Sequence, residues 1–447
     1  METPIYTRLS DYHKKNRISF AMPGHKNLRG LAPDLQQCDV TELASTVDLH
    51  HEDESVRRAN ELLSELYGSR YSYIMTGGST AGVQAMIAAA LKPGDTLLAS
   101  ADCHMSVINT CAVCGFRLRL IPIGFVKEHG VPGVLEDLCI DKDVRAVLLT
   151  SPDYYGRVKD IAAAAEKCHA LGVPLLVDEA HGAHFIADKA FPESAVRLGA
   201  DAVCQSAHKT LNALTGAAYL HVCSDRLSRA RIKRALVSFQ SSSPSYPIAA
   251  SADAARAVLS ETDYTDILME CRGFREAVSR ATNIRFIKND DPTRLVLSFM
   301  EYETTGFEVS ERLSGYYGID VEMADLCNIV LIVTPWNTHS DFMELFRALR
   351  DITGVLSQSG GNMYECPPVM AGTADPSAGW YADTEYVDID KAIGRIAAAT
   401  VSSYPPGTGI IITGTVITEG QTEYIKRLIA AGAEIAGMTD NKIEVVV

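Results

Sequence analysis

Short apolar segments alternate with helical segments between Tyr71 and Val222, and this alternation constrains the fold more than any other feature. Strands are expected at 71–75, 96–99, 117–123, 144–150, 174–177, 202–205 and 217–222, and helices at 79–91, 104–114 and 161–171. Short strands that alternate with helices form mainly parallel sheets covered on both faces. We therefore expect an α/β fold built on a mainly parallel seven-stranded sheet.

The flanking parts of the chain follow other patterns. Residues 1–60 are polar and irregular, with helices expected at 7–15 and 55–67. Beyond the sheet, helices are expected at 253–268, 271–281, 341–351 and 388–400, and strands at 284–287, 293–298, 318–321, 328–333 and 409–413. We therefore divide the chain into an N-terminal segment (1–60), a large domain (61–280) and a smaller C-terminal α+β domain (281–447).

Composition limits the classes of binding partner and the cellular compartment that we expect for this protein. A net charge of −15 argues against a nucleic-acid or anionic-membrane partner and favours a cationic substrate. The N-terminus lacks the basic start and apolar core of a signal peptide, and no apolar run reaches the length of a membrane span. The 11 cysteines are scattered, which is typical of reduced thiols in a cytoplasmic protein. Cys111 and Cys114 form a C-x-x-C without a second pair, so redox or zinc use is not expected.

Polar residues stand where the predicted strands end, which is the edge of such a sheet that binds ligands. One group is Thr76-Gly77-Gly78-Ser79-Thr80, between a strand and a helix. The amides of the first helical turn and the Ser79 and Thr80 hydroxyls could hold a phosphate. The alternative is a plain turn with a serine cap. A Walker loop is excluded because no lysine follows the glycines.

A second group begins at Asp178, after the strand at 174–177. Its carboxylate is suited to hold the protonated ring nitrogen of pyridoxal phosphate (PLP), and Ala180 is small enough for a ring to lie against the backbone. His181 and His184 are three residues apart and could ligate a metal, but further ligands are missing nearby. We therefore expect no metal here.

Lys209 follows the strand at 202–205 in Ser206-Ala207-His208-Lys209. A lysine at the end of a buried strand can form a Schiff base with an aldehyde cofactor, whereas an isolated lysine is usually a solvated surface residue. His104 opens the helix at 104–114 and is either a partly buried terminal histidine or an imidazole stacked on a cofactor ring. Together these residues predict a PLP site.

The combination of Met-Pro-Gly-His-Lys with Ser-x-His-Lys is specific. With these segments the chain resembles the Orn/Lys/Arg decarboxylases, PLP enzymes of fold type I, and especially the shorter branch without an N-terminal receiver-like domain. The segments that carry the resemblance span nearly the whole chain: Met22–Lys26, Asp39–Leu43, Gly78–Thr80, Cys103–Asn109, Asp178–Gly182, Ser206–Lys209, Ser243–Tyr246 and Tyr404–Gly407.

This resemblance implies a role for each site residue. Lys209 would carry the cofactor, Asp178 would bind its ring nitrogen, and His104 and Ala180 would pack on its two faces. His181 would lie near the ring hydroxyl. The phosphate region would be held by Gly78, Ser79, Thr80, Ser206 and His208.

The resemblance also implies an activity: PLP-dependent decarboxylation of arginine, lysine or ornithine. The proton donor to Cα stays open among His104, His208 and Lys209. Another PLP reaction, such as transamination or a lyase reaction, and a non-catalytic PLP-binding protein are the alternatives. A homodimer is expected, with His25 and Lys26 reaching into the partner's cleft, although an ordinary surface turn is the alternative reading of Met22–Lys26.

Three departures from the family pattern put the substrate in doubt. Met105 stands where the family usually has lysine, and Thr413-Gly414-Thr415 stands where it commonly has Pro-Gly-Glu. The loop between Met370 and Tyr386 also differs.

Overall fold

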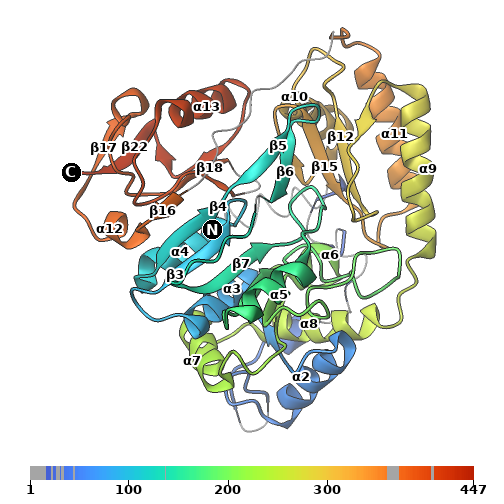
Figure 1. Ribbon diagram of the computed structural model, residues 1–447. Coiled ribbons are helices and arrows are strands. Elements are labelled where there is room, and N and C mark those ends of the chain that lie inside the picture. The colour runs from blue at the N-terminus through green and yellow to red at the C-terminus, as the bar shows by residue number, and fades with distance from the viewer. Residues whose placement is uncertain are drawn as a thin grey trace, which may run out of the picture.

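The computed structural model describes residues 17–21, 24–26, 31, 35–43, 46–135, 137–359, 372–403 and 407–447 (Figure 1). The helix expected at 7–15 lies outside these residues, as do Met22, Pro23 and residues 404–406. Within the described part of the chain, no helix combines the length and the apolar character needed to cross a bilayer.

An eight-stranded sheet forms the centre of the molecule, in the order β16-β4-β3-β7-β8-β9-β10-β2. Its strands are β2 (Tyr71–Met75), β3 (Thr96–Ser100), β4 (Arg117–Ile121), β7 (Val144–Thr150), β8 (Leu175–Asp178), β9 (Ala202–Gln205), β10 (Ala218–Val222) and β16 (Gly372–Ala374). Strands β4, β3, β7, β8 and β9 are parallel, whereas β10 is antiparallel to both neighbours and β16 to β4. The predicted mainly parallel sheet is confirmed, and the C-terminal part adds an eighth strand that was not predicted.

Both faces of this sheet are apolar, because successive strand residues point to opposite sides and the residues on both sides are apolar. Val147 and Leu149 of β7 pack in one hydrophobic cluster, and Ala146 and Leu148 pack in the other. On the Val147 face lie residues of α2 (Glu54–Tyr67), α5 (Ile161–Ala170), α8 (Tyr246–Leu259) and α9 (Thr265–Ala281). On the opposite face lie α3 (Gly78–Ala90), α4 (Met105–Cys114) and α7 (Arg229–Phe239).

A second, four-stranded sheet has the order β11-β12-β15-β14. Its strands are β11 (Arg285–Phe286), β12 (Arg294–Ser298), β15 (Asn328–Ile332) and β14 (Met323–Ala324), and α9 and α11 (His339–Thr353) lie along it (Figure 1). Leu295 and Leu331 belong to the same hydrophobic cluster as Val147, so the two sheets share a core. Short β1 (Ile18–Ser19) pairs with β13 (Ile319–Asp320) and attaches the N-terminal segment here.

The C-terminal residues build a third region with its own hydrophobic cluster, which includes Val401, Ile425 and Ile443. Its elements are α12 (Pro376–Trp380), β17 (Thr384–Asp388), η3 (Ile389–Lys391), β18 (Val401–Ser403), β19 (Gly409–Ile411), α13 (Glu419–Ala430), β20 (Ile435–Ala436), β21 (Met438–Thr439) and β22 (Lys442–Val446). The hairpin β5 (Ile123–Val126) and β6 (Val131–Leu135) extends from the central sheet between this region and the four-stranded sheet (Figure 1). The remaining elements are η1 (Leu35–Cys38), α10 (Gly306–Arg312) and η2 (Leu313–Tyr317).

Two predicted helices are wrong. The segment 388–400 forms only the short η3, because Gly394 has a φ of 80° and Ile396 and Ala397 make strand-like bridges to Val416 and Val445. The helix expected at 253–268 is divided between α8 and α9. The Asp263 carboxylate accepts the backbone N–H of Thr265 at 2.8 Å, and this local bond helps to start the second helix. Helix α13 was not predicted.

Candidate functional site

The predicted site lies at the carboxyl ends of β8 and β9, which are parallel neighbours. Asp178 is the last residue of β8, and Lys209 lies in α6 (Ala207–Thr210), directly after β9. The Nζ atom of Lys209 is 3.0 Å from Nε2 of His181, which follows the same strand as Asp178. The structure thus brings together an amine, an imidazole and a carboxylate from two strand ends.

Burial sets the charge balance between these groups. It is the main cause that raises the pKa of Asp178, and the nearby Lys209 opposes this shift. Burial also lowers the pKa of Lys209, while the carboxylates of Asp178 and Glu322 act in the opposite direction. Asp178 is only 4% exposed, so a cation placed against it would meet a strongly desolvated carboxylate.

His181 is held on its other side by Arg294 of β12. The Nη2 atom of Arg294 is 3.1 Å from Nδ1 of His181, and Nη1 donates to the Tyr154 carbonyl at 3.1 Å. The Tyr154 ring packs edge-on against the imidazole, with 4.7 Å between ring centroids. Burial, followed by the charges of Lys209 and Arg294, holds the pKa of His181 well below its usual value. These effects favour the neutral imidazole.

The expected phosphate-binding residues meet at the start of α3. The Ser206 hydroxyl donates to the Ser79 hydroxyl at 2.7 Å. Gly78 has a φ of 70°, a conformation that favours glycine, and its N–H donates to the Gly216 carbonyl at 2.8 Å. The N-cap of α3 is Gly77, without a side-chain cap, so the alternative of a serine-capped turn is wrong. Thr80 is exposed beside this helix end.

His104 lies at the N-cap of α4, where its Nδ1 accepts the N–H of Ser106 at 3.1 Å. Burial is the main cause that lowers its pKa to about 4, and Lys209 adds to the shift. A backbone bridge joins His104 to Thr408, and the Met105 N–H donates to the Gly407 carbonyl at 3.1 Å. The C-terminal region therefore packs beside this histidine.

His208 and Ala180 contribute largely through their backbone surroundings. Nδ1 of His208 bonds the Ala217 carbonyl at 3.0 Å, and burial is the main cause that lowers the pKa of His208 to about 4. The Ala180 N–H donates to the Asp178 carboxylate at 3.1 Å. His184, the second residue considered for a metal, lies 3.3 Å from Asp291 while His181 faces Lys209 and Arg294, so the two histidines do not converge.

The expectation that Lys26 reaches into a partner's cleft is wrong. Lys26 is only 1% exposed, and its Nζ donates to the carbonyls of Ala21 at 2.7 Å and Ile332 at 2.9 Å in its own chain. Burial lowers its pKa to about 7. The preceding Gly24 donates to the His208 carbonyl at 2.7 Å. This segment therefore supports the Lys209 loop from within the same chain, and His25 is buried with it.

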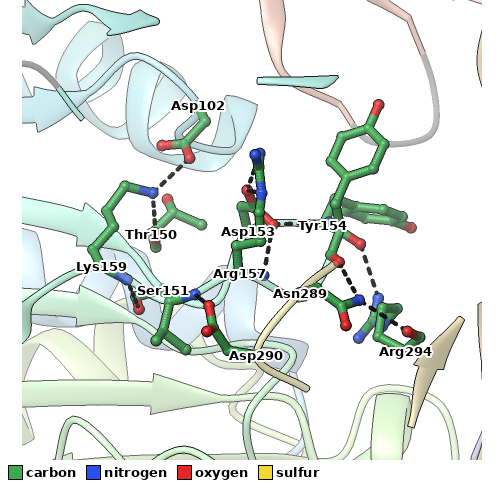
Figure 2. A network of polar contacts seen from close by, with 12 residues as sticks. Asp102, Thr150, Ser151, Asp153, Tyr154, Arg157, Lys159, Asn289, Asp290 and Arg294 are labelled. Atoms are coloured by element: carbon green, nitrogen blue, oxygen red, sulfur yellow. Dashed lines mark hydrogen bonds and ion pairs between the residues drawn. The ribbon is translucent and has the colours of Figure 1, made fainter. Parts of the chain in front are cut away.

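The loop between β7 and α5 carries Tyr154 and lies in a network of polar contacts (Figure 2). Lys159 forms an ion pair with Asp102 at 2.6 Å, and Arg157 forms one with Asp153 at 2.7 Å. Asp102 follows the end of β3, and Asp153 follows the end of β7. The ion pairs hold the loop that presents Tyr154 to His181.

Arg294, Tyr154 and Glu322 were missed as site residues. Arg294 stands at the start of the apolar run Leu295–Leu297, so the local pattern predicts only a strand residue there. A charged residue inside a buried strand is the signal that could have identified it. Glu322 is buried and accepts a hydrogen bond from the Tyr154 hydroxyl.

Comparison with known proteins gives consistent matches over the whole chain. The family model for the major domain of Orn/Lys/Arg decarboxylases matches residues 3–336, and the model for their C-terminal domain matches residues 363–442. An uncharacterized protein of Bacillus subtilis (strain 168), YaaO, is 34% identical over 98% of this chain and 96% of its own length. An arginine decarboxylase of Bacillus anthracis is 28% identical over 99% of this chain and 96% of its own length.

Solved structures show the same fold. The constitutive lysine decarboxylase of E. coli matches with a TM-score of 0.75 at 17% identity, over 99% of this chain and 81% of that chain. An alanine–glyoxylate aminotransferase of Nostoc sp. matches with a TM-score of 0.55 at 14% identity, over 79% and 96%. The architecture is therefore that of PLP fold type I enzymes. Because the family models for both domains match, the chain belongs to the Orn/Lys/Arg decarboxylase family.

Proposed function

We propose that this protein is a PLP-dependent decarboxylase that converts a basic amino acid to CO2 and the corresponding amine. The observation that carries the proposal is the pair of half-buried Lys209 and buried Asp178 at neighbouring strand ends, with His181 3.0 Å from the lysine amine. Family membership supports the reaction class, and relatives named arginine decarboxylase make arginine the first substrate to test.

The residues present fit PLP. A primary amine is needed for the cofactor aldehyde, and Lys209 supplies it. A buried carboxylate is needed for the ring nitrogen, and Asp178 supplies it. Gly78, Ser79 and Thr80 at the N-terminus of α3, with Ser206 bonded to Ser79, suit the phosphate, because an uncapped helix start favours an anion. When bound, PLP supplies an electron sink for the electron pair that remains as CO2 leaves.

The remaining residues position the ring and handle protons. Asp178 would hold the ring nitrogen, and its negative charge would keep that nitrogen protonated. His104, held by Ser106, and Ala180 would contact the two faces of the ring. Because burial lowers the pKa values of His104 and His208 to about 4, neither histidine is in the acidic imidazolium form at neutral pH. Lys209 is therefore the favoured proton donor to Cα.

The proposal also covers domain organisation, location and assembly. It includes a division into residues 1–60, 61–280 and 281–447, a cytoplasmic location and a homodimer as the working unit. The ten described cysteines are free thiols, which supports a reducing compartment. Light scattering tests the dimer, and a stable, active monomer would refute it.

The test is a screen of amino acids for CO2 release by the purified, PLP-loaded protein. We expect release with one basic amino acid, and borohydride reduction followed by peptide mapping should place the pyridoxyl group on Lys209. Lys209→Ala should abolish both signals. Lys26→Met, which removes another buried lysine, is the matched control and should keep the label on Lys209. Production of a keto acid without CO2 would favour transamination instead.

A further inference from the structure

Arg294 connects the four-stranded sheet to the site from a fully buried position. It is 1% exposed and is the largest fully buried side chain in the described chain. Figure 2 shows its contacts with Tyr154 and Asn289, whose side-chain amide donates to the Arg294 carbonyl at 2.9 Å. Among the described residues, its Nε finds no hydrogen-bond partner. The guanidinium is thus committed to the Tyr154 carbonyl and to His181.

The chemistry of arginine fixes the direction of the bond to His181. A guanidinium is always charged in proteins and has five N–H donors but no acceptor. At 3.1 Å between Nη2 and Nδ1, Arg294 must therefore donate and Nδ1 must accept. A neutral imidazole carries one proton on its two nitrogens, so in His181 that proton is on Nε2.

This tautomer determines the next bond in turn. Nε2 of His181 is 3.0 Å from Nζ of Lys209. Since Nε2 carries the proton, it donates, and Nζ must accept through a lone pair. A protonated amine has three donors and no acceptor, so only the free amine completes this chain of hydrogen bonds.

We propose that Arg294 is a positioning residue that fixes the tautomer of His181 and thereby holds Lys209 as a free amine in the cofactor-free protein. The inference deepens the proposed function and rests on it in one respect, namely that Lys209 is the amine that bonds the cofactor aldehyde. A free amine has the lone pair that addition to an aldehyde carbon requires, and an ammonium does not. Arg294 would therefore prepare the protein to capture its cofactor.

The surrounding charges are divided on this point. Asp178, Glu322 and Cys204 favour the protonated form of Lys209, whereas burial and Arg294 favour the free amine. Around His181, burial and the charge of Arg294 both favour the neutral ring. The direction of the hydrogen bonds and burial both favour the free amine of Lys209, whereas the carboxylates of Asp178 and Glu322 oppose it. The protonation state of Lys209 should therefore be sensitive to Arg294.

The first test reads the tautomer directly in the cofactor-free wild-type protein. Nitrogen-15 NMR of labelled histidines distinguishes the two neutral forms, and His181→Gln identifies the signals of His181 by their loss. We expect a proton on Nε2. A proton on Nδ1 would overturn the proposal without any change to Arg294, so the result does not depend on whether an Arg294 variant folds.

The second test measures the proton equilibrium of Lys209. Cofactor-free protein is labelled with formaldehyde and cyanoborohydride across a pH series, and the modified fraction of Lys209 is read by mass spectrometry. Arg294→Met should raise the labelling midpoint by about one pH unit, which slows labelling about tenfold at a fixed pH below it. His181 should also lose its preference for Nε2–H in this variant.

Arg275→Met is the matched control, because the Arg275 guanidinium donates to the Pro292 carbonyl at 2.8 Å and to the Arg294 carbonyl instead of to His181. It should leave the midpoint unchanged. Equal midpoints in the two variants would overturn the role of Arg294. Neither measurement uses turnover, so a protein with the expected tautomer and midpoint but without decarboxylation would refute the proposed function and leave this inference standing.

Discussion

Two adjacent carboxylates at the end of β8 lie in opposite surroundings, Asp178 in the site and Glu179 in the core. Both are buried, at 4% and 2% exposed, and burial raises the pKa of both, that of Glu179 to about 7. Glu179 accepts hydrogen bonds from the Ser194 hydroxyl at 2.6 Å, the Ala195 N–H at 2.7 Å and the Gln205 amide at 2.6 Å. Its bonding capacity is largely used within the chain.

Asp178 is left available by comparison. Within the described chain its carboxylate accepts one hydrogen bond, from the Ala180 N–H at 3.1 Å, and its main attractive charge is Lys209. A buried carboxylate with few protein donors is costly unless a ligand completes it. The difference teaches that burial alone does not identify a functional carboxylate, whereas burial without sufficient internal partners does.

The largest effect should follow loss of the charge of Asp178. Asp178→Asn should lower turnover of the PLP-loaded protein about a thousandfold or more, which corresponds to about 4 kcal/mol of transition-state stabilisation. PLP should still bind, because the phosphate end is unchanged. Steady-state kinetics and the cofactor absorption spectrum check this, and near-normal turnover would remove the distinction between the two carboxylates.

Glu179 should give the opposite result, a loss of stability. Glu179→Ala leaves the donors of Ser194, Ala195 and Gln205 without their acceptor and opens a cavity, so unfolding should become easier by about 3 kcal/mol. Denaturant titration measures the loss. Turnover per folded molecule should stay within about tenfold of wild type. A stable but inactive Glu179→Ala protein would mean that both carboxylates serve the reaction.

A pH titration should sharpen the comparison, because the contribution of Glu179 to the free energy of unfolding should fall by about 2 kcal/mol between pH 5 and 7. The folded pKa of Glu179, about 7, lies above its ordinary value of 4.5, so in this range the folded state binds more protons than the unfolded state. The stability from protonated Glu179 is therefore present below pH 4.5 and is lost as the pH rises through 7. Wild type minus Glu179→Gln isolates this slope, and a zero difference would show that Glu179 is ionised throughout.

The smallest effect should come from the phosphate end of the site. Ser206→Ala removes the hydroxyl that bonds Ser79 and should weaken PLP binding about fivefold, or about 1 kcal/mol. Equilibrium titration with PLP measures this change. Ser194→Ala, which removes a hydroxyl from the Glu179 side, is the control and should leave PLP affinity unchanged while lowering stability. Weaker PLP binding by Ser194→Ala but not by Ser206→Ala would place the cofactor beside Glu179 instead of Asp178.

Local signals explain which features were predicted from the sequence. Tyr71–Met75, Val144–Thr150 and Ala202–Gln205 form strands at the predicted residues, because each is an apolar run that ends at polar or turn residues. Asp178, His181 and Lys209 were expected to lie together because they follow neighbouring strands, and the structure brings them together.

The missed features depend on distant parts of the chain. Burial of Lys26 requires the carbonyl of Ile332, which no pattern near Lys26 reveals. Arg294 gains its importance from His181, 113 residues earlier. The apolar spacing of Ile389, Ile393 and Ile396 is typical of a helix. Instead, Ile396 pairs with Val416 before α13, and the next residue, Ala397, pairs with Val445 of β22. Long-range pairing overrode the local period there.

Through strand β16, the C-terminal region covers one edge of the central sheet. Gly372–Ala374 pairs with β4 at the border of the central sheet, where a strand would otherwise present a row of unpaired backbone groups. Until these late residues emerge from the ribosome, that border is open to pairing with other chains. A chain that ends near residue 336 would keep Lys209 and Asp178 but would leave this border bare, so its characteristic failure would be aggregation.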